Sequence, residues 1–361
     1  MDTIEGVIYL ARCAVKEEKA DKSVVDGLDL DAVYREASRH MIAAMCGMAL
    51  KDAGISTPAF KTAIASAQRK TVTLNYEMAA VCRELETAGI WHMPLKGSII
   101  KDWYPKFGMR EMVDCDILYD KSRIGDMRRI MSSLGFSTVI VDEMHHDIFQ
   151  KKPISTFEMH TELFGPGHKK QVNTYYSNIE KKLLKKANYE NEFSPDDLYL
   201  YLMTHEYEHY STSGTGIRSV VDTYVALKTI ADKLNWNYIA QETEKIGISE
   251  FEEKNRNLAL HLFDGQISDQ EKAMLSYMAD SGSHGTMENN IMNAVESRGG
   301  GILGKVKYIW HRVVLPMDVV QRFYPIFYKH KILLPFLPIY RLYRGCRRGM
   351  AVVEVKLLTK V

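Results

Sequence analysis

The sequence predicts an α+β protein in which a small mixed β-sheet lies between N- and C-terminal helical regions. Apolar side chains recur at helical spacing through the first part of the chain, up to Ala88 and Gly89. Between residues 90 and 164, five short segments instead have the composition and the largely alternating pattern of strands. Helical spacing returns between residues 194 and 294. Strands gathered in one stretch, with helices before and after it, are typical of the α+β class.

The individual elements follow in a definite order. A helix over residues 61–88 ends at a glycine, and the segment IWHMPLK after it is a short strand. GSIIKDWYP is a helical turn, EMVDCDILYD a second strand, and SRIGDMRRIMSSLGF a helix with a serine cap and a glycine exit. FSTVIV, DIFQK and STFEMHTELF are three further strands. We therefore expect an N-terminal helical region (residues 1–70), an α/β core (71–170), a helical domain (171–296), and a glycine linker with a basic tail rich in proline and aromatic residues (297–361).

The composition is that of a globular protein in a reducing compartment. Hydrophobic residues make up 46% of the chain and charged residues 26%, which is ordinary for a folded domain. The start, MDTIEGVIYLARC, lacks the basic segment and long apolar run of a secretory signal. No stretch reaches the roughly 18 apolar residues that a membrane span needs. The five cysteines are scattered, as free thiols are. We therefore expect a cytoplasmic protein.

The charge is unevenly distributed along the chain. From Lys305 to the end, twelve Lys and Arg stand against two acids, a net charge of +10, while the first 304 residues carry −9. Two interpretations of the basic tail stay open: peripheral contact with an anionic inner-membrane surface, or packing against the acidic body, which the charge balance favours. GGGILGK, ahead of the tail, nearly matches a phosphate-binding loop. Because Val306 replaces the required Ser or Thr, we interpret it as a flexible joint.

Two aspartates on the second strand are the first candidates for chemistry. Asp114 and Asp116 are two apart, so their side chains point to one face of the strand. Adjacent carboxylates repel each other, and Mg²⁺ is the usual counter-ion at an all-oxygen site. Solvated acids on an exposed edge strand are the alternative. Gly97 and Ser98 lie at a turn between strand and helix, where backbone N–H groups and a hydroxyl can hold a phosphate.

These segments together resemble a known family. LKGSIIKDWYPKFGMREMVDCDILYD looks like the bacterial uncharacterised nucleotidyltransferase family, within the DNA polymerase β-like nucleotidyltransferase superfamily. The features that carry the resemblance are Leu95-Lys96-Gly97, Tyr104-Pro105, Arg110, Asp114-x-Asp116-Ile117-Leu118 and Met159-His160. Further along, LMTHEYEH (residues 202–209), Arg218 and Asp222 are similar to a family helix with two histidines followed by an arginine and an aspartate.

The resemblance implies two-metal phosphoryl transfer from Mg-NTP. Asp114, Asp116 and a third acid would hold two Mg²⁺ ions, with Mn²⁺ as the alternative ion. Glu158 is the expected third acid, and Glu162, on the same strand face, is its rival. The remaining expected nucleotide-binding residues are Lys96, Gly97, Ser98, Arg110, His160, His205 and His209.

The segment HEYEH admits a different interpretation. His205, Glu206 and His209 match the zinc-protease pattern H-E-x-x-H, although the metzincin extension is absent. We expect the two histidines to serve the nucleotide site instead. The function expected is transfer of NMP to an unknown hydroxyl, on a small molecule or a protein rather than RNA, because the body is acidic. The alternatives are a silent nucleotide-binding or assembly module and, with less support, a zinc protease.

Overall fold

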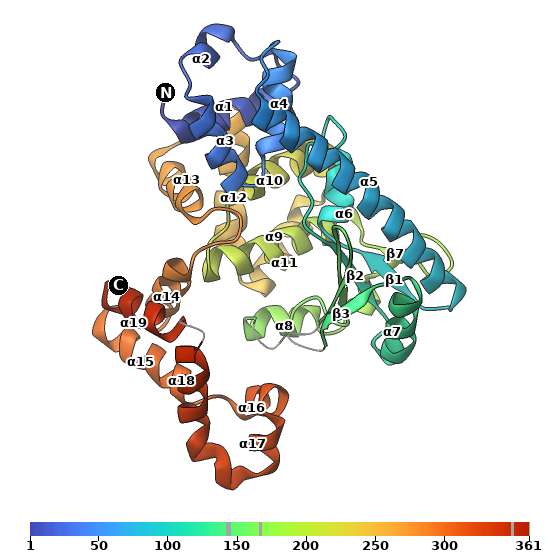
Figure 1. Ribbon diagram of the computed structural model, residues 1–361, viewed down its shortest axis with the longest axis vertical. Helices are drawn as coiled ribbons and strands as arrows, with labels where there is room; N and C mark the ends of the chain where they lie inside the picture. The colour runs from blue at the N-terminus through green and yellow to red at the C-terminus, as the bar shows by residue number, and fades with distance from the viewer. Residues whose placement is uncertain (142–145, 166–167, 348–349, 361) are drawn as a thin grey trace. The chain divides into compact units, whose positions relative to one another are not determined.

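The computed structural model describes residues 1–141, 146–165, 168–347 and 350–360. The chain forms two compact units, which are described separately (Figure 1). The first comprises Met1–Tyr207 and Gly216–Ser283, and the second comprises Glu208–Thr215 and His284–Val361. Among the described residues, every helix is too short or too polar to cross a membrane.

Five helices precede the sheet in the first unit. The first of them begins with a capping box, in which Asp2 accepts a hydrogen bond from the backbone of Glu5 and the Glu5 side chain accepts one from Asp2. The last of them has Thr57 as its cap and Pro58 at its first position. The five helices are α1 (Thr3–Val15), α2 (Lys22–Asp26), α3 (Leu30–Arg39), α4 (Ala43–Asp52) and α5 (Pro58–Thr87).

The five predicted strands all form, and they make one mixed sheet of order β1-β2-β5-β4-β3. The pair β2–β5 is parallel, whereas β1–β2, β5–β4 and β4–β3 are antiparallel. This arrangement confirms the predicted α+β class. The strands are β1 (His92–Pro94), β2 (Cys115–Tyr119), β3 (Ser137–Ile140), β4 (His146–Lys151) and β5 (Ser155–His160), with α6 (Gly97–Ile100) after β1 and α7 (Ile124–Ser133) after β2.

One face of the sheet forms the core of this region. Alternation along β2 and β5 directs Cys115, Ile117, Phe157 and Met159 to that face. The helices α5 and α7 cover it with side chains that include Leu74, Val81, Leu85, Met127 and Met131. The residues between them in sequence, Asp116 and Glu158, are therefore directed to the opposite face.

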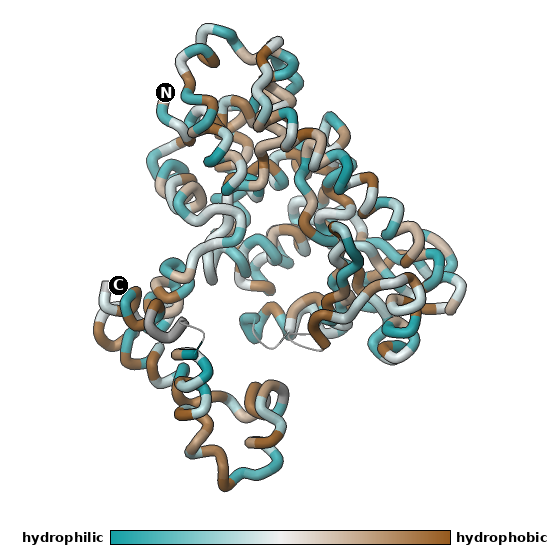
Figure 2. The backbone as a smooth tube through the Cα atoms, in the orientation of Figure 1, coloured by the Kyte–Doolittle hydropathy of each residue, from teal (hydrophilic) through white to brown (hydrophobic). Residues whose placement is uncertain are grey.

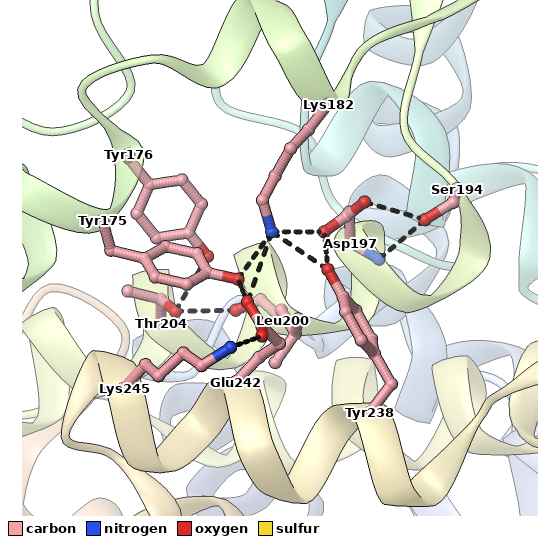
Figure 3. Close-up of polar contacts among 10 residues, drawn as sticks. All are labelled: Tyr175, Tyr176, Lys182, Ser194, Asp197, Leu200, Thr204, Tyr238, Glu242 and Lys245. Atoms are coloured by element: carbon pink, nitrogen blue, oxygen red, sulfur yellow. Dashed lines mark hydrogen bonds and ion pairs between the residues drawn. The ribbon is translucent and has the colours of Figure 1, made fainter.

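Helices return after the sheet, with a short hairpin of β6 (Leu184–Lys185) and β7 (Asn191–Glu192) before most of them. A polar network joins three of these segments around Lys182 (Figure 3). The Nζ atom of Lys182 donates hydrogen bonds to the hydroxyls of Tyr175 (2.7 Å) and Tyr238 (3.0 Å) and to Oδ1 of Asp197 (3.0 Å). Glu242 lies 3.5 Å from the same nitrogen. The helices are α8 (Lys170–Tyr176), α9 (Pro195–Thr212), α10 (Ile217–Ile230), α11 (Trp236–Ile246), α12 (Ser249–Asp264) and α13 (Asp269–Ser281).

The second unit is helical. Its small core joins Ile291, Val295 and Tyr308. The predicted flexible joint is partly wrong: Gly299 and Gly300 have positive φ, but a helix begins at Gly301 and continues through GILGK. Figure 2 shows hydrophobic residues recurring along these C-terminal helices. They are α14 (Met287–Glu296), α15 (Gly301–Val313), α16 (Met317–Phe323), α17 (Pro325–Lys329), α18 (Leu337–Arg347) and α19 (Met350–Lys360).

Candidate functional site

Three carboxylates lie near one another on the face of the sheet opposite its apolar core. Asp116 on β2 is the register partner of Glu158 on β5, so the two side chains stand side by side across the parallel pair. Asp114 lies one residue before β2 and interacts electrostatically with both of them. All three are buried or half-buried. Negative charge is thus concentrated where water can solvate it only in part.

The proximity of these acids perturbs their proton affinities in opposite directions. Burial and the charge of Asp116 raise the pKa of Asp114 to about 6. Burial and the charges of Asp116 and Asp114 raise the pKa of Glu158 to about 7. Burial alone would also raise the pKa of Asp116, but Lys96 and His160 outweigh it and hold that pKa below its ordinary value. At neutral pH Asp116 is therefore the carboxylate most firmly ionised.

Two histidines border the acids. His160 Nε2 lies 3.0 Å from Asp116 Oδ1 and 3.6 Å from Glu158 Oε2. His146 on β4 is the register partner of His160, and its Nε2 also lies 3.6 Å from Glu158 Oε2. The two imidazole centroids are 4.8 Å apart. Burial lowers the pKa of His160, despite the opposing effect of Asp116.

The turn after β1 brings a cation to the acids through a strained backbone. Lys96 has φ +40° and ψ −112°, a conformation that costs a side-chain-bearing residue about 1–2 kcal/mol relative to glycine. Its Nζ lies 3.6 Å from Asp116 Oδ1. A strained residue whose side chain faces a buried carboxylate is a candidate for function, because glycine would satisfy the backbone better.

Arg110 lies over this turn and is held in place by an aspartate from α10. A Cβ at Gly97 would meet Arg110 Nη1 at 2.7 Å, so a larger residue there would displace the guanidinium from its present position. Asp222 accepts two hydrogen bonds from Arg110, at 2.8 Å and 2.9 Å, and a third from the hydroxyl of Tyr104 at 2.6 Å. Although burial would lower it, the pKa of Arg110 is raised by Asp222. Arg218, also buried, interacts electrostatically with Asp222 and Asp114.

The other predicted site residues have different surroundings. The Ser98 hydroxyl lies against the Cys115 thiol, on the core side of β2. Glu162 follows β5 and is exposed, with Lys121 Nζ at 4.0 Å. His205 on α9 is half-buried, 6.3 Å from the ring of Tyr201 between centroids. His209 is exposed and belongs to the second unit.

The protease interpretation of HEYEH lacks a metal centre. Glu206, which would activate a zinc-bound water, is buried and accepts hydrogen bonds from Thr223 at 2.9 Å and Asn255 at 3.1 Å. Burial raises the pKa of Glu206 to about 8. In the part of the chain that the structure describes, no third ligand gathers with His205 and His209. The motif is therefore part of helix α9, and its glutamate is a buried side chain that accepts hydrogen bonds from α10 and α12.

The donor set of the carboxylate site fits a divalent cation. Asp114, Asp116 and Glu158 bring three carboxyl groups together, and Lys96 supplies one positive charge at ion-pairing distance from Asp116. The nearby guanidinium of Arg110 is already paired with Asp222. Carboxylate oxygens in such number, with their charge incompletely balanced, are the ligands that hard dications take.

The sequence alone did not place three residues of this region: His146, Arg218 and Asp222. His146 begins a strand in the run MHHDIF, and nothing in its spacing links it to His160. Only the register of β4 against β5 does so. Asp222 and Arg218 stand out in the sequence only through the family resemblance, and neither has a local motif that assigns its partner.

The fold and this site define a nucleotidyltransferase-like α+β protein. The comparison with protein families agrees: the family described as "Uncharacterised nucleotidyltransferase" matches residues 26–264. The chain belongs to this family. Neither the curated proteins nor the solved structures contain a match to it. Nucleotidyltransferases generally use divalent metal ions and a nucleoside triphosphate.

Proposed function

We propose that this protein transfers an NMP group from Mg-NTP to an acceptor hydroxyl. The observation that carries the proposal is the pairing of Asp116 with Glu158 across β2 and β5, with Asp114 beside them. In the reaction, the acceptor oxygen forms a bond to the α-phosphorus, and the bond from that phosphorus to pyrophosphate breaks. The acceptor proton leaves to solvent, and pyrophosphate departs.

Each group of the site has a role that follows from its position. Asp114, Asp116 and Glu158 would hold two Mg²⁺ ions, or Mn²⁺ in their place, which supply Lewis-acid stabilisation of the phosphate charge when bound. Lys96 and Arg110, which pair with Asp116 and Asp222, would also offer positive charge to the triphosphate. Gly97 leaves room for the Arg110 guanidinium. His160 lies beside Asp116 and, with Ser98 and His205, remains a predicted nucleotide contact.

The acceptor is a hydroxyl on a small molecule or a protein. An RNA end fits less well, because residues 1–304 carry a net charge of −9 and phosphate backbones need basic surfaces. A silent nucleotide-binding or assembly module is the second candidate. It would bind the triphosphate at the same carboxylates without releasing pyrophosphate.

A thermal-shift experiment with the four NTPs tests the proposal. A ligand that binds the folded state raises its melting temperature even when the acceptor is unknown. We expect stabilisation by one or more NTPs with Mg²⁺, its loss with EDTA, and its loss in Asp114→Asn and Asp116→Asn. Glu162→Gln is the matched control, since its carboxylate is exposed and pairs with Lys121. Equal stabilisation of wild type and both aspartate variants would refute the site, and pyrophosphate release separates the enzyme from the silent module.

We also propose that the second unit contacts an anionic membrane surface through α15. Ile302, Ile309 and Trp310 are exposed by 83%, 48% and 63%, and with Val306 and Val313 they recur at spacings that place them on one side of the helix. The opposite side, with Gly304 and Tyr308, packs against α14. Each residue of an α-helix is rotated by about 100° from the one before it, which places Lys305 and Lys307 on the two borders of the apolar side. Helices that lie in the headgroup region of a membrane have this arrangement.

The occupant inferred for this face is a bilayer rich in anionic lipid, because α15 leaves an apolar side exposed within a segment that carries +10 from Lys305 onward. We expect the protein to sediment with vesicles of phosphatidylcholine and phosphatidylglycerol but not with phosphatidylcholine alone, and salt to weaken binding. Trp310→Ser should reduce binding several-fold, while Tyr76→Ser, which removes an exposed aromatic ring on α5, should not. Absence of binding would refute the membrane proposal, and equal binding to neutral vesicles would show that anionic lipid is not what the face recognises.

A further inference from the structure

The carboxylate site has a second side that is built from nitrogen ligands. His146, Glu158 and His160 each offer one donor atom, and these three atoms lie within 4.8 Å of one another. Both imidazole Nε2 atoms are 3.6 Å from the same carboxylate oxygen, Glu158 Oε2. Among the described residues, this is the one group of three or more His, Cys, Asp or Glu side chains with such convergence.

The backbone explains why the three side chains converge. Glu158 and His160 are two apart on β5, so they share a face of the sheet. His146 lies directly opposite His160 in the antiparallel pair with β4. The donors therefore come from two hydrogen-bonded strands, which fix their spacing more firmly than a loop would.

The spacing is close to that of a metal-binding site. Metal–ligand distances of about 2.1 Å place neighbouring donors about 3.0 to 3.4 Å apart in octahedral or tetrahedral coordination. The two observed separations of 3.6 Å exceed that range by a few tenths of an ångström, and all three donor atoms lie within 4.8 Å of one another, so the side chains would move closer together to bind an ion.

The chemistry of the donors selects the ion. Mg²⁺ prefers oxygen ligands and retains its waters, whereas imidazole suits transition-metal dications. Asp116 Oδ1 lies 3.0 Å from His160 Nε2 and 3.6 Å from Lys96 Nζ, so it borders this position and the all-carboxylate position alike. The two sides of the site thus offer different ligands to two ions.

We propose that His146, Glu158 and His160 form a binding position for a transition-metal dication, distinct in preference from the position that Asp114 and Asp116 offer to Mg²⁺. The proposal rests on the proposed function in one respect, namely that the ion lies at the nucleotidyl-transfer site. Its ligand set is independent of which nucleotide or acceptor the protein uses.

The test is Mn²⁺ binding to the full-length protein after treatment with EDTA and desalting. The EPR signal of free Mn²⁺ measures its affinity, competition measures that of Mg²⁺, and pulsed EPR detects nitrogen nuclei bound to Mn²⁺. We expect one Mn²⁺ site at least tenfold tighter than Mg²⁺, with nitrogen coupling. His146→Gln should lower this preference to about threefold or less, because it replaces a nitrogen ligand with an amide. His261→Gln, which removes a histidine hydrogen-bonded to Glu271 on α12 and α13, should behave as wild type.

Two results would overturn the proposal. One is Mn²⁺ binding to wild type without nitrogen coupling, which needs no variant and so does not depend on a variant's folding. The other is a folded His146→Gln protein with an unchanged Mn²⁺/Mg²⁺ ratio. Failure of the proposed function has a different signature: nitrogen-coupled Mn²⁺ would be present, but no NTP would stabilise wild type with Mg²⁺. NTP stabilisation that is lost in Asp114→Asn, without nitrogen coupling, would retain the function and reject the histidine position.

Discussion

Asp222 neutralises a buried guanidinium, and its replacement by asparagine would measure how much that charge stabilises the site. Arg110 donates two hydrogen bonds to the Asp222 carboxylate, and Tyr104 donates a third. The side chains of Arg110 and Asp222 are only 10% and 17% exposed. Burial would raise the pKa of Asp222, but Arg110 outweighs it, so that pKa lies below its ordinary value. Asp222→Asn keeps the shape of the side chain and removes its charge.

The expected cost follows from the uncompensated charge. Breaking a buried ion pair by removing one partner costs about 3–5 kcal/mol, because the other charge stays buried. Arg218 is a second buried guanidinium that interacts with both Arg110 and Asp222. Asp222→Asn would remove the negative charge that compensates the repulsion between these two arginines. Asparagine retains one acceptor oxygen, which favours the lower end, about 3 kcal/mol. At about 2 °C per kcal/mol for a domain of this size, the melting temperature should fall by about 6 °C.

Calorimetry at pH 7.5 would measure this change, with Asp232→Asn, at an exposed position of the same unit, as the control. The double variant Arg110→Met with Asp222→Leu should recover much of the loss, because it removes both charges, yet it should not recover nucleotide binding. Because the pKa of Asp222 is lower in the folded state, its contribution is present above about pH 4 and is lost as the pH falls further. A single variant that melts within 2 °C of wild type, or a double variant no more stable than the single one, would refute the reasoning.

Three further predictions concern the same unit. Without metal, the raised pKa values of Asp114 and Glu158 make the fold less stable as pH rises between about 4 and 7, because the folded state holds these protons more tightly. Stabilisation by Mn²⁺ or Mg²⁺ should accordingly increase from about pH 5.5 to 8 in thermal shifts, and a flat profile would contradict the assignment. Lys96→Gly should be more stable than Lys96→Ala by about 1 kcal/mol in urea unfolding, because φ is positive at this residue. Both variants should lose NTP affinity. Equal stability of the two variants would show that the backbone at Lys96 is not strained. Lys182→Met should cost about 1–3 kcal/mol, because Asp197 and Glu242 lose their shared cation, and an unchanged urea midpoint would show that the network of Figure 3 contributes little.

Local patterns were sufficient to predict the secondary structure of the sheet. All five strands formed where period-two alternation and composition predicted them, and α5 and α7 lie within a few residues of their expected ranges. These elements were predictable because alternation acts between residues close in sequence. The predicted serine cap of α7 is wrong: Arg123 occupies the cap position without a side-chain cap hydrogen bond, and Asp120 caps the turn before it. The glycine run failed for the opposite reason: Gly299–Gly301 predicts flexibility locally, but packing of Gly304 against Val295 supports a helix from Gly301 onward.

The composition of the site depended instead on pairings that no local pattern encodes. A strand sequence determines which side chains share a face, but the neighbour of that face depends on register between distant segments. Asp116 and Glu158 are 42 residues apart in sequence and become neighbours because β5 pairs in parallel with β2. His146 joins them because it is the register partner of His160 in the antiparallel pair of β4 and β5. A shift of β4 by one residue would replace His146 with Asp147, whose carboxylate now pairs with Arg128. The same strand would then present an additional acid in place of a nitrogen ligand, so the metal preference of the site depends on the β4–β5 register.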